Sequence, residues 1–181
     1  MEEAMKLFCV HGYEAVSIRT IADCVGIANS ALYKHYKSKH EILEAIVDYS
    51  KEYYLSVGST WMTGITSVED LERACLQMFH FQTQDAWIVM FRKLLMLERF
   101  HNEEMEEIFQ SFFIELPINS QAVLFQNLME KNIMRRNDPY VLAMQLYAPF
   151  FLYHTKTNVT SDMEARLISH VHSFSDMYIF S

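Results

Sequence analysis

The chain has 181 residues, of which 51% are hydrophobic, and its formal net charge is −8. This hydrophobic content is sufficient for a sizeable core, so it argues against an intrinsically disordered chain. The four glycines and three prolines are too few for a turn-rich β architecture. The composition therefore predicts an all-α protein whose helices are joined by short loops.

The sequence carries no pattern typical of a membrane or secreted protein. It starts Met-Glu-Glu-Ala, without the basic start and apolar run of a signal peptide. The longest stretch without a charged residue, 139–155, contains Gln145 and two prolines and is shorter than the roughly 20 residues of a spanning helix. We therefore expect a cytoplasmic protein with no membrane partner. The three cysteines lack CxxC spacing, which predicts reduced thiols.

The first predicted helix ends at Gly12, which we expect to cap it in the left-handed conformation. The second begins after Ser17, a residue type that is preferred at the N-cap. Its apolar residues have the spacing of a helix that buries one face: Ile18, Ile21, Ala22 and Val25. Gly26 then predicts a tight turn.

A third predicted helix follows this turn, with Ala28, Leu32 and Tyr36 on one face. Ser38 predicts the N-cap of a fourth helix that begins at Lys39 or His40. Two short helices joined by a glycine-containing turn, in a three-helix setting, make a helix-turn-helix. We therefore predict a DNA-binding domain over residues 1–50, which we call the head.

The sequence pattern of the remaining residues, 51–181, predicts longer helices. We expect these residues to form a second domain, for ligand binding and dimerisation, which we call the body. Residues 58–66 are expected to be a loop. Asp138 directly before Pro139 combines a cap residue with a proline at the first helical position, which is a firm start signal. The predicted helices of the body cover residues 68–83, 86–101, 103–115, 120–131, 138–155 and 161–180.

Basic residues are concentrated in the head. Residues 17–40 hold four basic residues and one acidic residue, whereas residues 51–181 hold ten basic and sixteen acidic residues. A local cationic patch on an otherwise acidic chain is typical of a surface that binds phosphates. Asn29, Ser30 and Ala31 open the third helix, where Asn and Ser can bond base edges and an Ala methyl can meet a thymine methyl. The patch therefore predicts double-stranded DNA as a partner.

The stretch GYEAVSIRTIADCVGIANSALYKHYKSKHEILEAI, residues 12–46, resembles the DNA-binding head of the TetR (tetracycline-repressor) family of bacterial regulators. A weaker similarity at NIMRRNDPYVLAMQLYAPFFLYH, residues 132–154, resembles the start of the family's dimerisation helices. The resemblance implies that Leu32 and Tyr36 are core residues. It also assigns the DNA-contacting residues: Ser17 and Arg19 for phosphate or base contact, Asn29, Ser30 and Ala31 for bases, and Tyr33, His35 and Lys39 for the DNA backbone. Lys34 lies among them and adds a positive charge suited to phosphate contact.

The resemblance implies a homodimer that binds a near-palindromic operator and represses transcription until an unknown small-molecule inducer alters the separation of the two heads. Two departures from the family pattern keep a rival open. Ala28 stands where a Ser or Thr cap is usual, and Ser30 stands where Gly is frequent. The rival is a helical ligand-binding or oligomeric interaction protein whose head no longer binds DNA.

Apolar stripes in the body indicate two further surfaces. One set of residues is predicted to line a ligand pocket: Phe91, Leu94, Glu98, Phe112, Met144 and Tyr147. Residues of the same types would also fill a hydrophobic core. Others step by three and four residues and predict a four-helix dimer interface, with packing inside one subunit as the alternative: Ala148, Phe151, Leu167, Val171, Phe174 and Tyr178.

We expect no enzymatic activity, cofactor or metal site. Nucleophile-elbow and phosphate-loop patterns are missing from the sequence. Glu98 and His101 have the Glu-x-x-His spacing of di-iron bundles, but those sites need a second such motif, and the sequence has none.

Overall fold

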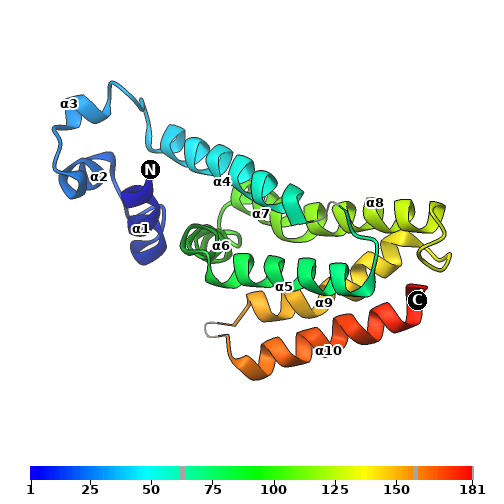
Figure 1. Cartoon of the computed structure of the whole chain (residues 1–181). Coiled ribbons are helices and arrows are strands. Elements are labelled where there is room, and N and C mark those ends of the chain that lie inside the picture. Colours follow the sequence, from blue (N-terminus) through cyan, green and yellow to red (C-terminus); the bar gives the residue numbers. More distant parts are fainter. Residues whose placement is uncertain (62–63, 157–158, 181) are drawn as a thin grey trace. The chain divides into compact units, whose positions relative to one another are not determined.

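The computed structural model describes residues 1–61, 64–156 and 159–180, leaving aside the side chains of residues 59–61. The described residues form helices, with one isolated antiparallel β-bridge between Met134 and Ile179 (Figure 1). The prediction of an all-α fold is confirmed. The helices are α1 (Glu2–His11), α2 (Ile18–Val25), α3 (Asn29–Leu32), α4 (Lys39–Trp61), α5 (Val68–Gln84), α6 (Ala86–Glu98), α7 (Glu103–Gln110), the π-helical η1 (Ser111–Glu115), α8 (Leu116–Glu130), α9 (Pro139–His154) and α10 (Ser161–Tyr178).

The contacts within the chain divide it into two compact units. The first unit comprises Met1–Ser56 and Ala86–Phe109, and the second comprises Val57–Asp85 and Gln110–Ser181. Helix α6, which the sequence assigns to the body, thus packs with the helices of the head. The domain boundary at residue 50 stays a prediction, because compactness alone does not establish which segments fold independently.

The predicted helix starts are confirmed by hydrogen bonds to their caps. Ser17 Oγ accepts from the Thr20 backbone N–H at 3.0 Å, and Ser38 Oγ accepts from the Glu41 N–H at 3.0 Å. Asp138 accepts from two backbone N–H groups at the start of α9. Each cap satisfies donors that a helix leaves unpaired in its first turn, which is why these polar residues mark the starts in the sequence.

The prediction that the third helix extends to Tyr36 was wrong, because α3 ends at Leu32 and a turn follows. The Lys37 backbone N–H donates to Glu41 Oε2 at 2.7 Å, while Ser38 caps the same helix. These two bonds between side chains and backbone fix the start of α4 after Ser38. Gly12 has a positive φ of 83°, but with ψ 153° it is not the left-handed cap that we expected.

The predicted loop over residues 58–66 was wrong for its first part, because α4 continues to Trp61. Residues 62–63 of that loop lie outside the described residues. The two helices predicted at 103–115 and 120–131 are instead one continuous run of α7, η1 and α8. Pro117 lies in the first turn of α8 and lacks the N–H that an uninterrupted α-helix would use. The preceding turn is π-helical, a local widening that long helices use at such interruptions.

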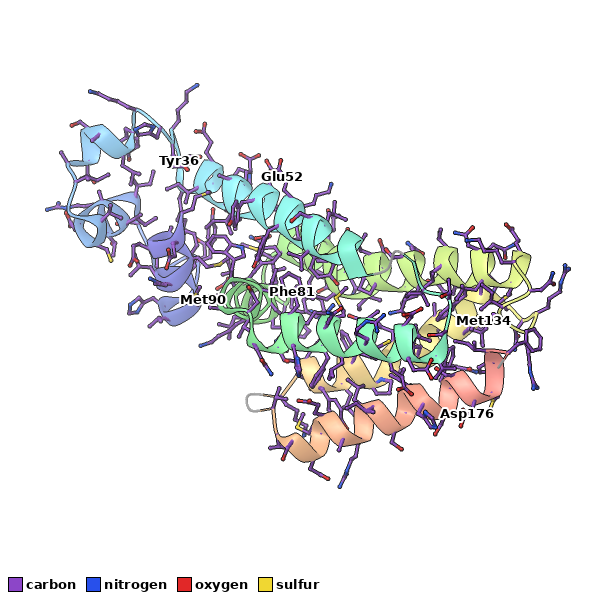
Figure 2. All side chains as sticks on the ribbon, in the orientation of Figure 1. Tyr36, Glu52, Phe81, Met90, Met134 and Asp176 are labelled. Atoms are coloured by element: carbon purple, nitrogen blue, oxygen red, sulfur yellow. The ribbon has the colours of Figure 1, made fainter. Side chains whose placement is uncertain are left out.

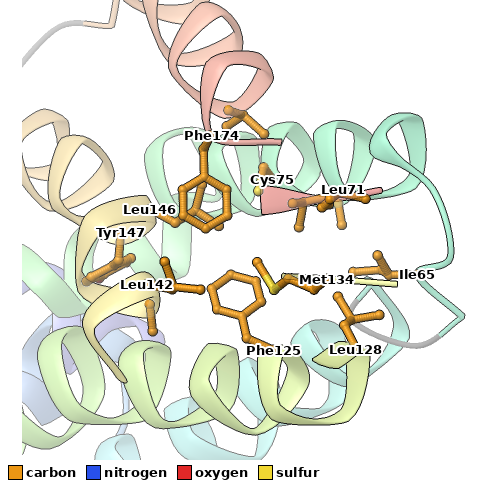
Figure 3. Close-up of a cluster of buried hydrophobic side chains, with 14 of the residues drawn as sticks. Ile65, Leu71, Cys75, Phe125, Leu128, Met134, Leu142, Leu146, Tyr147 and Phe174 are labelled. Carbon is orange, nitrogen blue, oxygen red and sulfur yellow. The ribbon is translucent and has the colours of Figure 1, made fainter. Parts of the chain in front are cut away.

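The hydrophobic core of the second unit is built from the inner faces of α5, α8, α9 and α10 (Figure 3). Phe125 of α8 is fully buried, and its ring centroid lies 5.5 Å from that of Phe174. Leu167, Val171 and Phe174 are only 1–5% exposed within this single chain. These three residues are therefore core residues, and the predicted interface seam on α10 is corrected to the alternative of packing inside one subunit.

A histidine on the surface of the second unit links α10 to α5. His172 Nδ1 lies 2.7 Å from Glu72 Oε1, and His172 Nε2 lies 3.5 Å from Asp176 Oδ2. The hydrogen bond to Glu72, followed by the charges of Asp176 and Glu72, raises the pKa of His172. A raised folded-state pKa stabilises the fold at pH values below the unfolded pKa of about 6.5, and this stabilisation is lost as the pH rises through the folded pKa.

We therefore expect the melting temperature to fall as the pH rises above the unfolded pKa of about 6.5, and to fall less in His172→Gln. Thermal unfolding followed by circular dichroism at a series of pH values measures this. His101→Gln, which changes an exposed histidine in the first unit, is the control. Identical pH dependence in wild type and His172→Gln would contradict the expectation.

None of the helices in the described parts of the chain is both long and apolar enough to cross a membrane.

Candidate DNA-binding site

Helices α2 and α3 form the predicted helix-turn-helix. Gly26 ends α2 in the left-handed conformation with φ 76° and ψ 29°, which a residue without Cβ adopts at little cost. The backbone N–H of Ile27 donates to the Ala22 oxygen at 3.0 Å, which closes the turn. Ala22 and Leu32 are buried, so the inner faces of the two helices are fixed against the rest of the first unit.

The residues predicted to read bases differ in how far they reach the surface. Ser30 is exposed, whereas Asn29 and Ala31 are only partly exposed. Asn29 turns its Oδ1 inward, where it has no hydrogen-bond partner among the described atoms. Ala28 occupies the N-cap position of α3 without a side-chain cap bond, and the Ala31 N–H of the first turn donates to the Ala28 carbonyl oxygen at 2.9 Å.

Side chains suited to phosphate contact flank these residues. Tyr33 is 52% exposed, and Lys34 and His35 are also exposed. Arg19 projects from the start of α2 with 80% of its side chain exposed and lies 3.8 Å from Asp23. Because an exposed ion pair of this kind is weak, a phosphate could replace Asp23 as the partner of the Arg19 guanidinium.

Ser17 pairs with a residue that the sequence analysis did not single out. The hydroxyls of Ser17 and Thr20 are 2.8 Å apart, and both side chains are exposed at the N-terminus of α2. A pair of hydroxyls at a helix N-terminus is suited to donating to a phosphate oxygen. The i, i+3 spacing after the cap was the signal that could have indicated Thr20.

Lys39, predicted to clamp the DNA backbone, bonds to backbone atoms of its own chain. Its Nζ donates to the Tyr13 carbonyl oxygen at 2.8 Å and to the Glu14 carbonyl oxygen at 3.4 Å. The same ammonium lies 4.1 Å from the centroid of the Tyr13 ring, within the range of a cation–π interaction. Only 21% of the Lys39 side chain is exposed, so its charge fastens the turn between α1 and α2 in the free protein.

This difference predicts distinct behaviour for two lysine variants. Lys34→Ala removes an exposed phosphate contact, so it should weaken binding to all DNA sequences alike and lower the slope of log K against log salt by about 0.9. Lys39→Ala should leave this slope unchanged and instead lower the melting temperature. Fluorescence anisotropy titrations at several salt concentrations measure the slopes. An equal change of slope in both variants would return Lys39 to the DNA-contacting set.

The predicted ligand-lining residues fall into both units. Phe91 and Leu94, fully buried, belong to the first unit, as does Glu98, whose Oε1 accepts the Tyr13 backbone N–H at 2.9 Å. In the second unit the structure buries Phe112 and Tyr147 but leaves Met144 half exposed, and the Tyr147 hydroxyl donates to the Phe113 carbonyl oxygen at 2.7 Å. The lining stays a prediction, with Met144 at the surface and Glu98 bound to the head.

The described residues contain no cluster of three or more His, Cys, Asp or Glu side chains placed to hold a metal ion. Burial raises the pKa of the Cys75 thiol to about 12. This thiol is therefore protonated at neutral pH, as expected of a structural cysteine.

The head matches the model of a known family, described as bacterial regulatory proteins of the tetR family, over residues 1–46. A stretch of 47 residues is 36% identical to the HTH-type transcriptional repressor KstR2 of Mycolicibacterium smegmatis. That match covers 26% of this chain and 23% of the repressor, so it spans about a quarter of either protein.

The fold is similar over nearly the whole chain to solved structures of low sequence identity. A TetR-family transcriptional regulator from Mesorhizobium loti superposes with a TM-score of 0.77 and 20% identity, covering 99% of this chain and 94% of that one. The protein AibR, in complex with isovaleryl coenzyme A and operator DNA, gives a TM-score of 0.68 and 20% identity, covering 93% of each chain. The head, residues 1–46, is thus similar in sequence to bacterial regulatory proteins of the tetR family, and the fold of the whole chain is similar to that of a solved TetR-family regulator.

Proposed function

We propose that the chain is a sequence-specific DNA-binding repressor that acts as a homodimer in the bacterial cytoplasm and is released from its operator by a small molecule. The observation that carries the proposal is the α2–turn–α3 geometry, which leaves Ser30 exposed between Arg19 and the Tyr33–His35 segment. A polar residue at the start of the second helix is placed to contact base edges, while the flanking groups contact phosphates.

The repressor and the rival with a degenerate head differ in DNA binding. Genomic fragments of the source organism, titrated with the protein in a gel-shift assay at increasing salt, separate them. A repressor should retard a small subset of fragments at salt concentrations that abolish the binding of the others, because base contacts persist when counterion release weakens. Retardation of all fragments alike, or of none, would favour the rival.

The homodimer is proposed from an exposed stripe on α9 that we call the α9 stripe: Val141, Met144, Ala148 and Leu152. Val141, Met144 and Leu152 are 44–56% exposed, and Ala148 is exposed as well. Their spacing of three, four and four residues is that of a seam between helices, and Ala148 permits close approach. Of the residues first predicted for the interface, Ala148 stays in it, whereas the buried residues of α10 do not. Met144, first predicted to line the ligand pocket, belongs to the proposed interface instead.

Neighbouring residues of the predicted interface line the edge of the α9 stripe. Phe151 and Tyr178 are partly buried, and the Tyr178 hydroxyl donates to Gln145 Oε1 at 3.2 Å. This bond holds the end of α10 beside the middle of α9, next to the stripe. A two-fold dimer formed there would present two heads to a near-palindromic operator.

Relief by a small molecule is proposed from the similarity to AibR, which is solved with both isovaleryl coenzyme A and operator DNA. A dimer that contacts two successive major grooves needs its two recognition helices to lie about 34 Å apart. A ligand would lower DNA affinity only to the extent that it binds a state with a different separation more tightly.

A further inference from the structure

We propose that Glu98 is a positioning residue for DNA binding, because its carboxylate fixes the turn from which the DNA-contacting end of α2 begins. The inference rests on the proposed function of the head. Glu98 is the last residue of α6, and its Oε1 accepts the backbone N–H of Tyr13 at 2.9 Å, across 85 positions of the sequence. All the residues involved lie in the first unit.

The peptide groups of Tyr13 are held from two helices. Glu98 of α6 accepts from the Tyr13 N–H, and Lys39, the first residue of α4, donates to the Tyr13 carbonyl oxygen at 2.8 Å. Hydrogen bonds to a charged partner are stronger than neutral ones. Tyr13 itself is 7% exposed, and its ring packs edge-on against Phe8 at 5.2 Å. The turn therefore has little freedom while both charged side chains are in place.

The neighbouring glycine makes this contact possible. Gly12 has φ 83°, and a Cβ added there would lie 3.2 Å from Glu98 Oε1. A side chain at position 12 would thus be strained by its backbone conformation and would press on the carboxylate. A second contact fastens the same two helices further along, where the Cys9 thiol donates to the carbonyl oxygen of Met90, labelled in Figure 2, at 3.0 Å. Helix α6 therefore contacts α1 through Met90 and contacts the turn after α1 through its last residue, Glu98.

The turn held by Glu98 leads directly to the DNA-contacting end of α2. The Val16 N–H donates to the Tyr13 carbonyl oxygen at 3.3 Å, and the next residue is the N-cap Ser17. A displacement of Tyr13 would therefore shift Ser17 and Arg19, which are predicted to contact the DNA. Sub-ångström to ångström shifts of contacting groups lower specific affinity more than non-specific affinity, because base contacts require precise registration.

Two conservative variants separate the effect of the length of the Glu98 side chain from the effect of its charge. Glu98→Gln keeps a side-chain carbonyl oxygen at the same reach without the charge, whereas Glu98→Asp keeps the charge but is one methylene shorter. We expect Glu98→Asp to weaken binding to a selected operator fragment about tenfold, with unchanged binding to random DNA, and to increase the hydrogen exchange rate of the Tyr13 amide by a similar factor. Glu98→Gln should change both measurements by only about threefold, because its oxygen still accepts from the N–H and only the contribution of the charge to the hydrogen bond is lost. Glu107→Asp, an exposed position on α7, is the matched control for shortening a glutamate.

The opposite order, with Glu98→Gln impaired and Glu98→Asp like wild type, would overturn the proposal in favour of a purely electrostatic effect. Unchanged Tyr13 exchange in Glu98→Asp would overturn it as well. Failure of the wild type to prefer any fragment would instead reject the proposed function, while the exchange measurement would still test the contact between Glu98 and Tyr13. Near-ultraviolet circular dichroism of both variants establishes that the compared proteins are folded.

Discussion

Replacing Phe125 with alanine is expected to lower the free energy of unfolding by about 3–5 kcal/mol, the range for truncating a fully buried phenylalanine. The side chain is 0% exposed and contributes its ring to the core of the second unit beside Phe174 (Figure 3). The variant loses both the transfer free energy of the ring and the contacts around the cavity that remains. Urea denaturation followed by circular dichroism measures the difference.

The control for this variant lies two residues away on the same helix. Val123 is 64% exposed, so Val123→Ala should change the free energy of unfolding by no more than about 0.5 kcal/mol. Equal effects of the two substitutions would mean that α8 does not bury the face that the structure shows.

The second large effect is expected at the α9 stripe. The double variant Ala148→Glu and Leu152→Glu places two carboxylates on each side of the proposed two-fold interface, where burial without a partner is strongly unfavourable. Both positions are exposed within the single chain, so the subunit should fold. Analytical ultracentrifugation should show a folded monomer, and operator affinity should fall by at least about a hundredfold because the two heads no longer bind as one unit.

Val123→Glu provides the matched control, since it adds a charge at an exposed apolar position of the second unit outside the α9 stripe. It should leave both the oligomeric state and operator binding unchanged. A double variant that remains dimeric and binds the operator normally would contradict the assignment of the interface. The substitution of Phe174, by contrast, would not test the interface, because Phe174 is buried inside the subunit.

The sequence was most informative where one residue type performs one local task. Ser17, Ser38 and Asp138 were predicted as caps because short polar side chains satisfy the first N–H groups of a helix, and all three accept those bonds. It was misleading at the third helix, where the bonds that Ser38 and Glu41 make at the start of the next helix compete with the apolar repeat. The continuity of α7, η1 and α8 was also missed, because a proline in the first turn of a helix reads equally well as a break.

Surface and core could not be distinguished on α9 and α10 from spacing alone. Leu167, Val171 and Phe174 have the spacing of an interface seam and of an internal core face alike, and only the packing of α10 within the subunit decides between them. For the same reason the tasks of Glu98 and Lys39 were not predictable. Both bond to backbone atoms of one turn, and contacts over such sequence distances leave no periodic signal.

The central claim, that the head reads DNA sequence as part of a two-fold dimer, is tested most directly by the base preferences of wild type and a recognition-helix variant. Both proteins are used to select from a library of random duplexes, and the bound duplexes are sequenced. We expect wild type to enrich an inverted repeat whose half-sites lie about one helical turn, or a multiple of it, apart. The double variant Asn29→Ala and Ser30→Ala should lose preference at symmetric positions in the two half-sites, at a cost of about 1–3 kcal/mol per lost base contact. An enriched repeat that is identical for both proteins, or no enrichment by wild type at all, would contradict the account.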